Sequence, residues 1–347
     1  MIFVRPLSED FTLFTTNGKQ LLMETHKVEK INIDGQSTHH DQVFPIVYSG
    51  GAQFDGAPVA DWVRQHKCQI EAELSASGAI VFKNFGITDD QAFDSFIRAF
   101  DWPCFTYEES LSNAVRYNRT ELVFTANEAP PSVSIFLHHE MAQTPVYPSK
   151  LFFYCERAPS VGGQTPICRS DCLLAVLRTE VPDFVLACEK KGVRYSQTMP
   201  AENDLESGQG RSWGSTLSAE SIEFAETKLR HLNYEWHWEP DGALSVTSPV
   251  LPAVKTLSDG REVFFNQLIA AFKGWKGAGN GWRNLISYGD YSEINEEHIR
   301  MADKLADELT FDIRWQDGDI VLVDNYLVMH GRRPYIGRRG VLASLVA

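Results

Sequence analysis

The sequence predicts a mostly β fold with helices packed around it, and three features of the chain support this prediction. Residues 133–167 and 243–266 are rich in β-branched and aromatic residues broken by proline and glycine, which is typical of successive strands and turns. The apolar runs 319–323 and 341–346 have the length and composition of buried strands. Residues 171–233 are more helical, so we expect a helical insertion within a β framework.

The chain has 347 residues, which would allow about two domains at roughly 150 residues per domain. Residues 1–45 mix polar and apolar side chains without strong periodicity, and we expect them to be an amino-terminal extension. No Pro- or Gly-rich linker divides the remainder cleanly, so these features leave the number of domains open.

Individual elements follow from local signals. Apolar residues recur at mostly helical spacing over 57–77, and Gly78 follows where a C-cap glycine is common, so a helix is predicted there. Residues 79–82 read as a short buried strand. Residues 88–91, Thr-Asp-Asp-Gln, fit a capping box that opens a second helix. A further helix is expected over 296–309, before the terminal strands.

Composition and charge exclude several classes of function. The formal net charge is −14, and an acidic surface repels phosphate backbones and anionic membranes, so neither is an expected partner. No apolar run approaches the roughly 20 residues that span a bilayer. The first residues lack the basic-then-apolar plan of a secretory signal, and the six scattered cysteines form no CxxC pair, so a cytoplasmic location with reduced thiols is expected.

A candidate metal motif lies at the end of an apolar run, where His138-His139-Glu140 follows Ile-Phe-Leu. Alternate residues of a strand share a face, so His138 and Glu140 would point one way and His139 the other. His330, after the run 319–323, would supply a third ligand. Two imidazoles and a carboxylate leave open positions on the metal, as in non-heme Fe(II) oxygenases. Because the chain has 10 histidines and 46 acidic residues, an H-x-E match alone is weak, and a hydrogen-bonded core histidine is the simpler alternative.

A basic pair, Arg338-Arg339, lies just beyond His330 and leads into the last β run. An enzyme that coordinates a dicarboxylic oxo acid through one end needs a cation for the far carboxylate, and the bidentate fork of arginine suits that task. A solvated arginine pair near the carboxyl end is the alternative interpretation.

Two other classes of protein remain open. Residues 210–214 fit the G-x-S-x-G pattern of a serine hydrolase, with Ser212 as nucleophile and Asp324 and His330 in the required order, but no apolar strand precedes the motif. A non-catalytic β-barrel with a structural metal or zinc site is the third alternative, although such a site has no use for a distal arginine.

Four motifs together resemble a known family: HHEMA at 138–142, GGQTPI at 162–167, FFNQ at 264–267 and GDIVLVDNYLVMHGRRPYIGRRGVLASLV at 318–346. They are similar to the taurine-dioxygenase-like (TauD/TfdA) branch of Fe(II)/2-oxoglutarate oxygenases. Within it they are most similar to the subset with a glutamate ligand, which includes clavaminate-synthase-like and syringomycin-pathway hydroxylases. The resemblance covers roughly residues 45–347, and the terminal block is its most specific part.

The resemblance implies a double-stranded β-helix, a distorted jelly roll, with a helical insertion at about 171–233, so residues 46–347 are expected to form one domain. It implies His138, Glu140 and His330 as iron ligands, Arg339 as the anchor of the far carboxylate of 2-oxoglutarate, and a hydroxyl from Thr165. The interval from His330 to the arginine is shorter than in much of the family, which leaves Arg338 in competition with Arg339.

The chemistry implied by the resemblance uses Fe(II), 2-oxoglutarate and O2, releases succinate and CO2, and hydroxylates an unactivated C–H bond. Epoxidation or desaturation remains open, whereas Glu140 argues against halogenation. The subset suggests an amino acid or derivative, free or tethered to a peptidyl carrier protein, in secondary metabolism. A homo-oligomer is compatible with the sequence. Candidate substrate contacts are Arg116, Asn127, Glu128, Arg211 and Asn266, with Trp213, Trp236 and Trp238 as candidate pocket walls.

Overall fold

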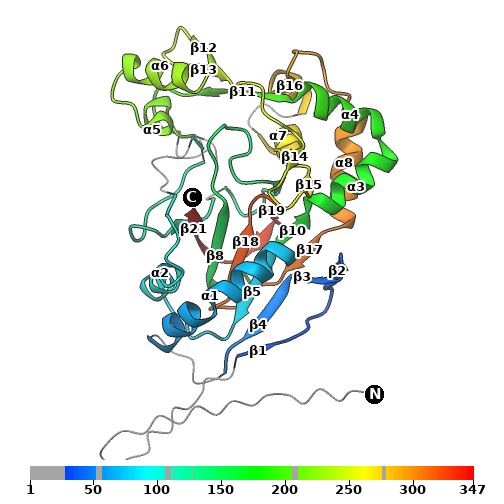
Figure 1. Cartoon of the computed structure of the whole chain (residues 1–347). Helices are drawn as coiled ribbons and strands as arrows, with labels where there is room; N and C mark the ends of the chain where they lie inside the picture. The colour runs from blue at the N-terminus through cyan, green and yellow to red at the C-terminus, as the bar shows by residue number, and fades with distance from the viewer. Residues whose placement is uncertain are drawn as a thin grey trace, which may run out of the picture.

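Two β-sheets pack face to face at the centre of the molecule (Figure 1). The computed structural model of the chain describes residues 28–51, 57–105, 111–112, 114–127, 129–204, 210–275 and 279–347. Side chains from both sheets form a shared apolar core that includes Val321 and Val323 from one sheet and Ile167 and Val328 from the other.

The larger sheet has seven strands and is antiparallel except for one pair, β4 and β5. Its central strand β18 is apolar at four consecutive positions because both of its faces are buried: Ile320 and Leu322 face helices, whereas Val321 and Val323 face the second sheet. The strands in spatial order are β1 (Glu29–Lys30), β4 (Ile46–Ser49), β5 (Ala79–Lys83), β18 (Ile320–Asp324), β8 (Lys150–Arg157), β21 (Gly340–Val346) and β6 (Phe124–Thr125).

The smaller central sheet is antiparallel and brings together segments that are far apart in the chain. Its strands in spatial order are β17 (Phe311–Ile313), β10 (Thr165–Arg169), β19 (Val328–Arg332) and β7 (Ile135–His138). Three two-stranded ribbons complete the framework: β2 (Ser37–His39) with β3 (Gln42–Phe44), β9 (Val161–Gly162) with β20 (Tyr335–Ile336), and β14 (Lys255–Thr256) with β15 (Glu262–Val263).

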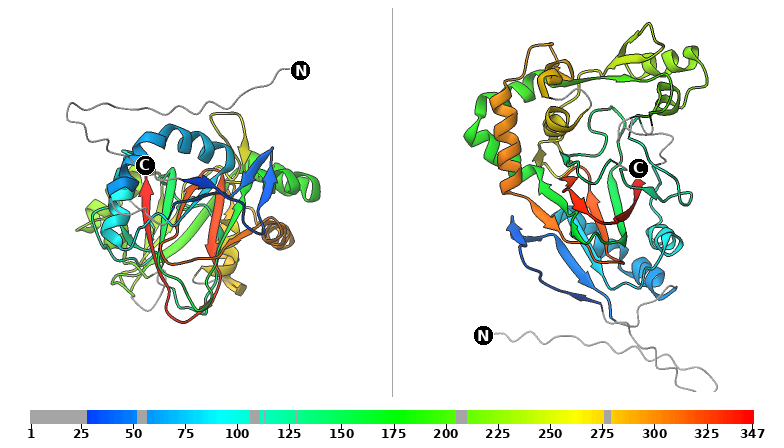
Figure 2. Two further views of the ribbon diagram at one scale, coloured as in Figure 1. Left: turned by 90° about the horizontal axis from the view of Figure 1, so that it is seen from below. Right: turned by 180° about the vertical axis from the view of Figure 1, so that it is seen from behind.

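Helices cover the outer face of each central sheet (Figures 1 and 2). The seven-stranded sheet is covered by α1 (Ala57–Ser77) and α2 (Asp90–Arg98), which form an apolar cluster with it. The smaller sheet packs against α3 (Ser170–Glu180), α4 (Pro182–Lys191), α7 (Leu268–Gly274) and α8 (Glu296–Glu308).

A third sheet stands apart from the central pair, at the top of Figure 1. Its strands in spatial order are β12 (Glu235–Trp238), β13 (Leu244–Thr247), β11 (Val193–Met199) and β16 (Ile286–Tyr288). The helices α5 (Trp213–Leu217) and α6 (Ile222–His231) pack against one face of it, and a 3₁₀ helix, Gly279–Asn284, precedes β16.

Three expectations about the fold need correction. Within the predicted extension 1–45, residues 29–30 pair with β4 and Phe44 is fully buried, so the described part of that segment belongs to the main fold. The predicted insertion is not only helical, because it contributes β11 to the third sheet. Helix α2 is capped by Asp89 rather than by Thr88, since the Asp89 carboxylate accepts a hydrogen bond from the Ala92 amide.

Among the described residues, no helix is long and apolar enough to cross a membrane.

Candidate metal centre

Two histidines lie opposite each other on neighbouring strands of the smaller sheet. His138 ends β7 and is the direct cross-strand partner of His330 on β19, and the two imidazole centroids are 4.4 Å apart. Antiparallel register therefore brings together residues 192 positions apart, because side chains directly opposite each other project from the same face. Both rings lie between the two central sheets, where the His330 ring is 5.2 Å from that of Phe153 on β8.

Glu140 reaches the same place from a turn rather than from the strand. Strand β7 ends at His138, and Met141 has a positive φ of 58° that reverses the chain immediately after Glu140. The Oε2 atom of Glu140 lies 3.8 Å from Nε2 of His138 and 3.5 Å from Nε2 of His330. His138 and Glu140 thus face the same side, as expected, but Glu140 does so because of the turn and not because it lies on the strand.

The donor set fits a divalent metal. One donor atom from each of His138, Glu140 and His330 lies within 4.8 Å of the other two. Nδ1 of His138 is 2.8 Å from the Phe136 carbonyl, and if it donates to that oxygen, the Nε2 lone pair is available to a metal. Burial, with His138 as a neighbour, lowers the pKa of His330 to about 4, so this imidazole is neutral and able to ligate at neutral pH.

The carboxylate of Glu140 is charged in spite of its burial. Burial alone would raise the pKa of Glu140, but the Arg116 guanidinium and the two imidazoles hold this pKa well below its usual range. Nη2 of Arg116 donates to Oε1 of Glu140 at 2.9 Å, and both side chains are less than one-tenth exposed. The site therefore presents an anionic carboxylate oxygen beside the neutral imidazole of His330, and both are donors that a ferrous ion accepts.

His139 points away from this cluster, as the alternation predicted. Its side chain is fully buried, its Nδ1 is 2.5 Å from the Asn325 carbonyl, and its ring is 4.7 Å from that of Phe265. His139 is thus a core histidine, whereas its two neighbours in the motif His138 and Glu140 face the cavity.

A cavity of about 60 Å³ adjoins the three candidate ligands, and Thr165, Arg339 and Asn127 also line it. The Thr165 hydroxyl accepts a hydrogen bond from the Trp315 indole at 3.1 Å, which leaves its own hydrogen for another acceptor. Arg339 donates from Nε to the Gly163 carbonyl at 3.2 Å. The chain at Gly163 packs closely against this arginine: Gly163 has a φ of +69°, and a Cβ added to it would lie 3.2 Å from Cδ of Arg339.

The two arginines that compete in the sequence differ in position. Arg339 lines the cavity beside His330, whereas Arg338 is exposed and borders only a separate surface hollow with Arg157 and Tyr335. Both residues lie in the loop between β20 and β21, and Arg339 borders both the surface hollow and the cavity, whereas Arg338 borders only the hollow.

The residues predicted to contact substrate do not form one group. Asn127 lines the cavity, and Arg116 lines it while paired with Glu140. Arg211 lies outside the lining and donates from Nη1 to the Ser112 carbonyl at 2.8 Å. Asn266 is buried and takes a structural role, because its amide binds the Ala253 carbonyl and the Leu268 amide. The prediction at Glu128 lies outside the described residues.

The tryptophans and Ser212 also have structural explanations. Trp213, Trp236 and Trp238 pack in the apolar cluster of the third sheet rather than around the candidate ligands. Ser212 caps α5, accepting a hydrogen bond from the Ser215 amide at 3.2 Å, and a cap residue before a short helix is not a nucleophile elbow. His330 faces Glu140 instead of a serine.

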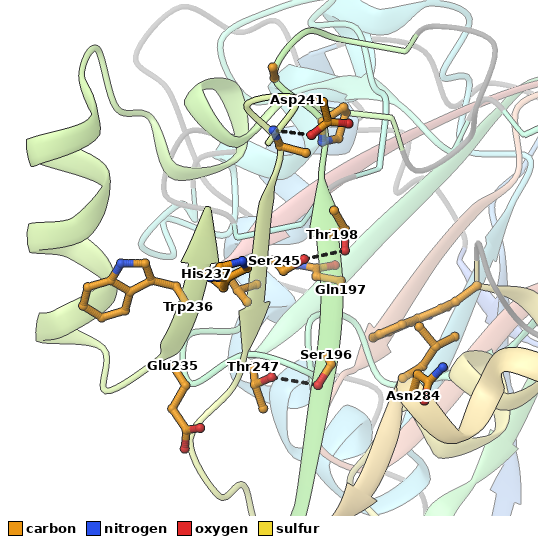
Figure 3. A pocket seen from close by; sticks show the side chains of 16 residues that line it. Ser196, Gln197, Thr198, Glu235, Trp236, His237, Asp241, Ser245, Thr247 and Asn284 are labelled. Atoms are coloured by element: carbon orange, nitrogen blue, oxygen red, sulfur yellow. Dashed lines mark hydrogen bonds between the residues drawn. The ribbon is translucent and has the colours of Figure 1, made fainter. Parts of the chain in front are cut away.

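Two further features of the described chain resemble binding sites. A cleft of about 760 Å³ lies on the polar face of the third sheet, where hydroxyl pairs such as Ser196 with Thr247 span the strands (Figure 3). It shares no lining residue with the cavity beside His138. Its lining offers no cluster of metal ligands.

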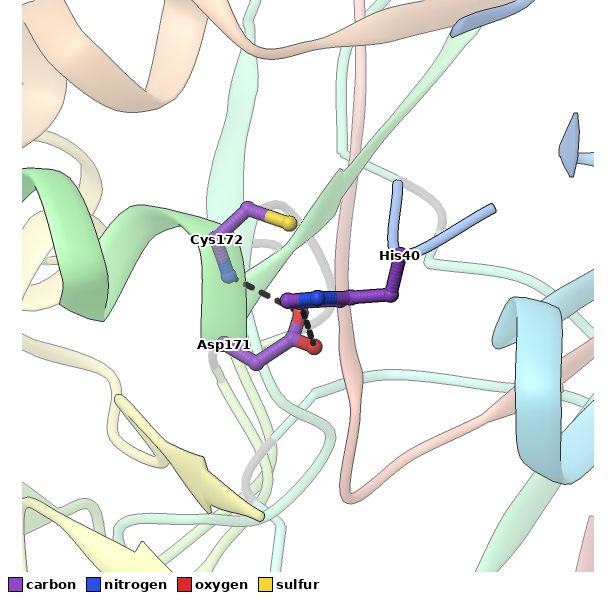
Figure 4. Close-up of side chains that lie close together, drawn as sticks. All are labelled: His40, Asp171 and Cys172. Atoms are coloured by element: carbon purple, nitrogen blue, oxygen red, sulfur yellow. Dashed lines mark hydrogen bonds and ion pairs between the residues drawn. The ribbon is translucent and has the colours of Figure 1, made fainter. Parts of the chain in front are cut away.

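The second feature is the group of His40, Asp171 and Cys172 (Figure 4). The Asp171 carboxylate is already neutralised, because Arg169 donates to both of its oxygens at 3.0 and 2.5 Å. Burial, and then the charge of Asp171, raise the pKa of the Cys172 thiol to about 12, so this sulfur is protonated at neutral pH. We therefore interpret this group as structural.

Asn325 and Arg332 are site residues that the sequence analysis missed. Asn325 is fully buried and binds the backbone of Glu140 through both atoms of its side-chain amide. Arg332 donates to the carbonyls of Asn127, Ala129, Pro130 and Val133 and so fixes the loop that carries Asn127. Both residues flank His330 in the segment DNYLVMHGRR, and this closeness in the sequence could have identified them as candidate site residues.

Comparison with known proteins shows the family to which the chain belongs. Residues 42–345 match the family described as "Taurine catabolism dioxygenase TauD, TfdA family". A clavaminate synthase-like protein of Arabidopsis thaliana is 34% identical over 320 residues, which cover 90% of this chain and 96% of that protein. The dapdiamide synthesis protein DdaC of Enterobacter agglomerans is 30% identical over 292 residues, covering 80% and 84% of the two chains.

Solved structures share the fold at low identity. PvcB from Pseudomonas aeruginosa superposes with a TM-score of 0.54 at 11% identity, covering 97% of this chain and 95% of that one. An asparagine oxygenase superposes with a TM-score of 0.50 at 13% identity, covering 82% and 79%. The expected double-stranded β-helix is thereby confirmed, as is the expectation of an oxidoreductase that uses Fe(II), 2-oxoglutarate and O2. The chain is a member of the TauD/TfdA family of dioxygenases.

Proposed function

We propose that this enzyme hydroxylates an unactivated C–H bond of an amino acid or amino-acid derivative, with His138, Glu140 and His330 as the iron ligands. The observation that supports the ligand set is the approach of Glu140 Oε2 to both imidazole Nε2 atoms, at 3.8 and 3.5 Å. When iron is bound, it supplies the activation of O2 coupled to decarboxylation of 2-oxoglutarate. The protein residues bind, orient and shield the reactants.

Arg339 and Thr165 are proposed to hold 2-oxoglutarate. The guanidinium lines the cavity next to His330 and can pair with the far carboxylate through two parallel hydrogen bonds. The Thr165 hydroxyl, oriented by the Trp315 indole, has its hydrogen free to donate to the same carboxylate. Phe153 and Val341 close the cavity with apolar surface, which excludes water from the reacting atoms.

Asn127 is the proposed polar contact for the substrate. It lines the cavity, and its loop is held in place by the four carbonyl contacts of Arg332. The relative from Enterobacter agglomerans is a dapdiamide synthesis protein, which supports a biosynthetic role. The substrate that we propose is an amino-acid derivative, free or on a peptidyl carrier protein, in secondary metabolism.

Two experiments test the proposal. Anaerobic addition of Fe(II) and 2-oxoglutarate should give a weak visible metal-to-ligand charge-transfer band, which should be absent in His138→Ala. A band that persists in that variant would show that the ligand assignment is wrong.

Succinate release, screened across free amino acids and carrier-bound aminoacyl thioesters, would identify the substrate class. Succinate release that depends on neither class would contradict the proposed amino-acid substrate.

A further inference from the structure

The two oxygens of the Glu140 carboxylate have different partners. Oε1 accepts a hydrogen bond from Nη2 of Arg116 at 2.9 Å, whereas Oε2 faces the Nε2 atoms of His138 and His330. We infer that Arg116 is a positioning residue that restricts Glu140 to one metal-facing oxygen. The inference rests on the proposed function, in which Glu140 is a metal ligand.

Arg116 is held firmly enough to impose this constraint. The residue after it, Tyr117, accepts a hydrogen bond from the Thr125 amide at 2.9 Å and donates its own amide to the Thr125 hydroxyl at 3.0 Å. Thr125 belongs to β6, which pairs with β21 at the edge of the seven-stranded sheet. The guanidinium carbon lies 5.3 Å from the centre of the Phe124 ring, and the side chain is 8% exposed.

Arg211 secures the chain on the other side of Arg116. It donates to the Ser112 carbonyl from Nη1 at 2.8 Å, and its Nε donates to the Ser215 hydroxyl at 3.1 Å. The short segment that presents Arg116 is thus tied to the sheet through Tyr117 and to α5 through Arg211. A guanidinium fixed in this way cannot follow the carboxylate if Glu140 turns.

A glutamate ligand needs such a constraint more than an aspartate would. Its extra methylene adds a rotatable bond, and a carboxylate can bind a metal through one oxygen or through both. A metal with about six coordination positions that binds three protein ligands keeps about three positions for the co-substrate and O2. A two-oxygen Glu140 would occupy one of these positions. The planar, always charged fork of Arg116 removes one oxygen from competition and leaves the other facing the imidazoles.

Two other roles for Arg116 predict different behaviour. As a substrate contact, which the sequence suggested, it would leave the metal coordination unchanged when replaced. As a purely structural residue, it would alter folding and weaken metal binding without altering the coordination of the metal that does bind. The number of water molecules on the bound metal separates these roles.

The test counts water molecules on Mn(II) bound to the full-length protein, by water-proton relaxation, without 2-oxoglutarate or turnover. We expect about three waters in wild type and in Arg116→Lys, and about two in Arg116→Gln and in Arg116→Met, whose side chain still packs on Phe124. The matched control is Arg119→Gln, because Arg119 pairs with Asp90 and Glu156 outside the cavity and should leave about three waters.

The outcomes distinguish the two proposals. Three waters in both neutral variants would overturn the role of Arg116, as would equal loss of metal binding in Arg116→Gln and Arg116→Lys. Mn(II) that does not bind the wild type, or that binds His138→Ala equally well, would overturn the proposed ligand set instead.

Discussion

The side-chain amide of Asn325 brackets the backbone of Glu140, although the two residues are 185 positions apart. Its Oδ1 accepts from the Glu140 amide at 2.7 Å, and its Nδ2 donates to the Glu140 carbonyl at 3.0 Å and to the Pro148 carbonyl at 2.8 Å. Because Asn325 also begins the turn that leads into β19, one residue fixes the carboxylate relative to the strand that carries His330.

Replacing Asn325 should therefore disturb both stability and the metal centre. Asn325→Ala leaves buried backbone groups of Glu140 and Pro148 without partners, and we expect the free energy of unfolding in urea to fall by about 2–4 kcal/mol. Affinity for Co(II) should fall by about tenfold. Asn295→Ala is the control, since Asn295 caps α8 and accepts from the Glu297 amide far from the cavity.

In that control we expect a loss of about 1 kcal/mol and unchanged Co(II) affinity. If both variants retain wild-type metal affinity, the bracket formed by Asn325 does not position Glu140.

Parts of the fold that depend on neighbouring residues could be predicted from the sequence. The helix expected over 57–77 has the same bounds as α1, because its apolar spacing and the glycine after it are local signals. The two terminal strands were predicted for the same reason, since short apolar runs buried on both faces are visible without their partners.

Parts that depend on distant pairing could not be predicted. Strand β11 lies between helices in the sequence and pairs with β13 and β16. Strand β16 follows it by about ninety residues, so the pairing that makes β11 a strand is not visible in the neighbouring sequence. At the candidate site, the motif with its strand alternation suggested His138, Glu140 and His330, and the resemblance implied the same three residues. The contact of Arg116 with Glu140 depends instead on how β6 packs beside β21, which no motif records.

The two neighbouring arginines near the carboxyl end should differ in their effect on co-substrate binding. Arg339→Gln removes charge-assisted hydrogen bonds worth about 1.5–3 kcal/mol, so the KM for 2-oxoglutarate should rise by roughly 10- to 100-fold. Arg338→Gln, which alters an exposed side chain, should change that KM by less than about twofold. Succinate formation measured against 2-oxoglutarate concentration checks both. The reverse order of effects would assign the anchor to Arg338.

The cap role of Ser212 gives a direct test against hydrolase chemistry. Ser212→Ala removes the acceptor for the Ser215 amide, so the protein should lose about 1 kcal/mol of unfolding free energy while succinate formation stays unchanged. Ser221→Ala is a matched control, because Ser221 caps the neighbouring helix α6 in the same way. Loss of turnover in Ser212→Ala but not in Ser221→Ala would reopen the case for a serine nucleophile.

Burial of His139 should make the metal-free protein sensitive to acid. Burial lowers the pKa of His139 to about 3, despite the hydrogen bond to the Asn325 carbonyl that opposes this shift, whereas in the unfolded chain the pKa is near 6.5. Below pH 6.5 the unfolded state therefore binds a proton that the folded state does not. The folded state loses stability as pH falls, and this loss continues until pH approaches 3.

The contribution of this residue can be isolated by comparing unfolding free energies between pH 4 and pH 6. His139→Asn retains a donor for the Asn325 carbonyl but cannot take up a proton, so its stability should fall less steeply with acid. The difference between the two slopes should be about 1.4 kcal/mol per pH unit at most, the value for a single proton. Other titrating groups, His330 among them, contribute to both proteins and largely cancel. Parallel curves for wild type and variant would show that His139 is protonated to the same extent in the folded and unfolded states.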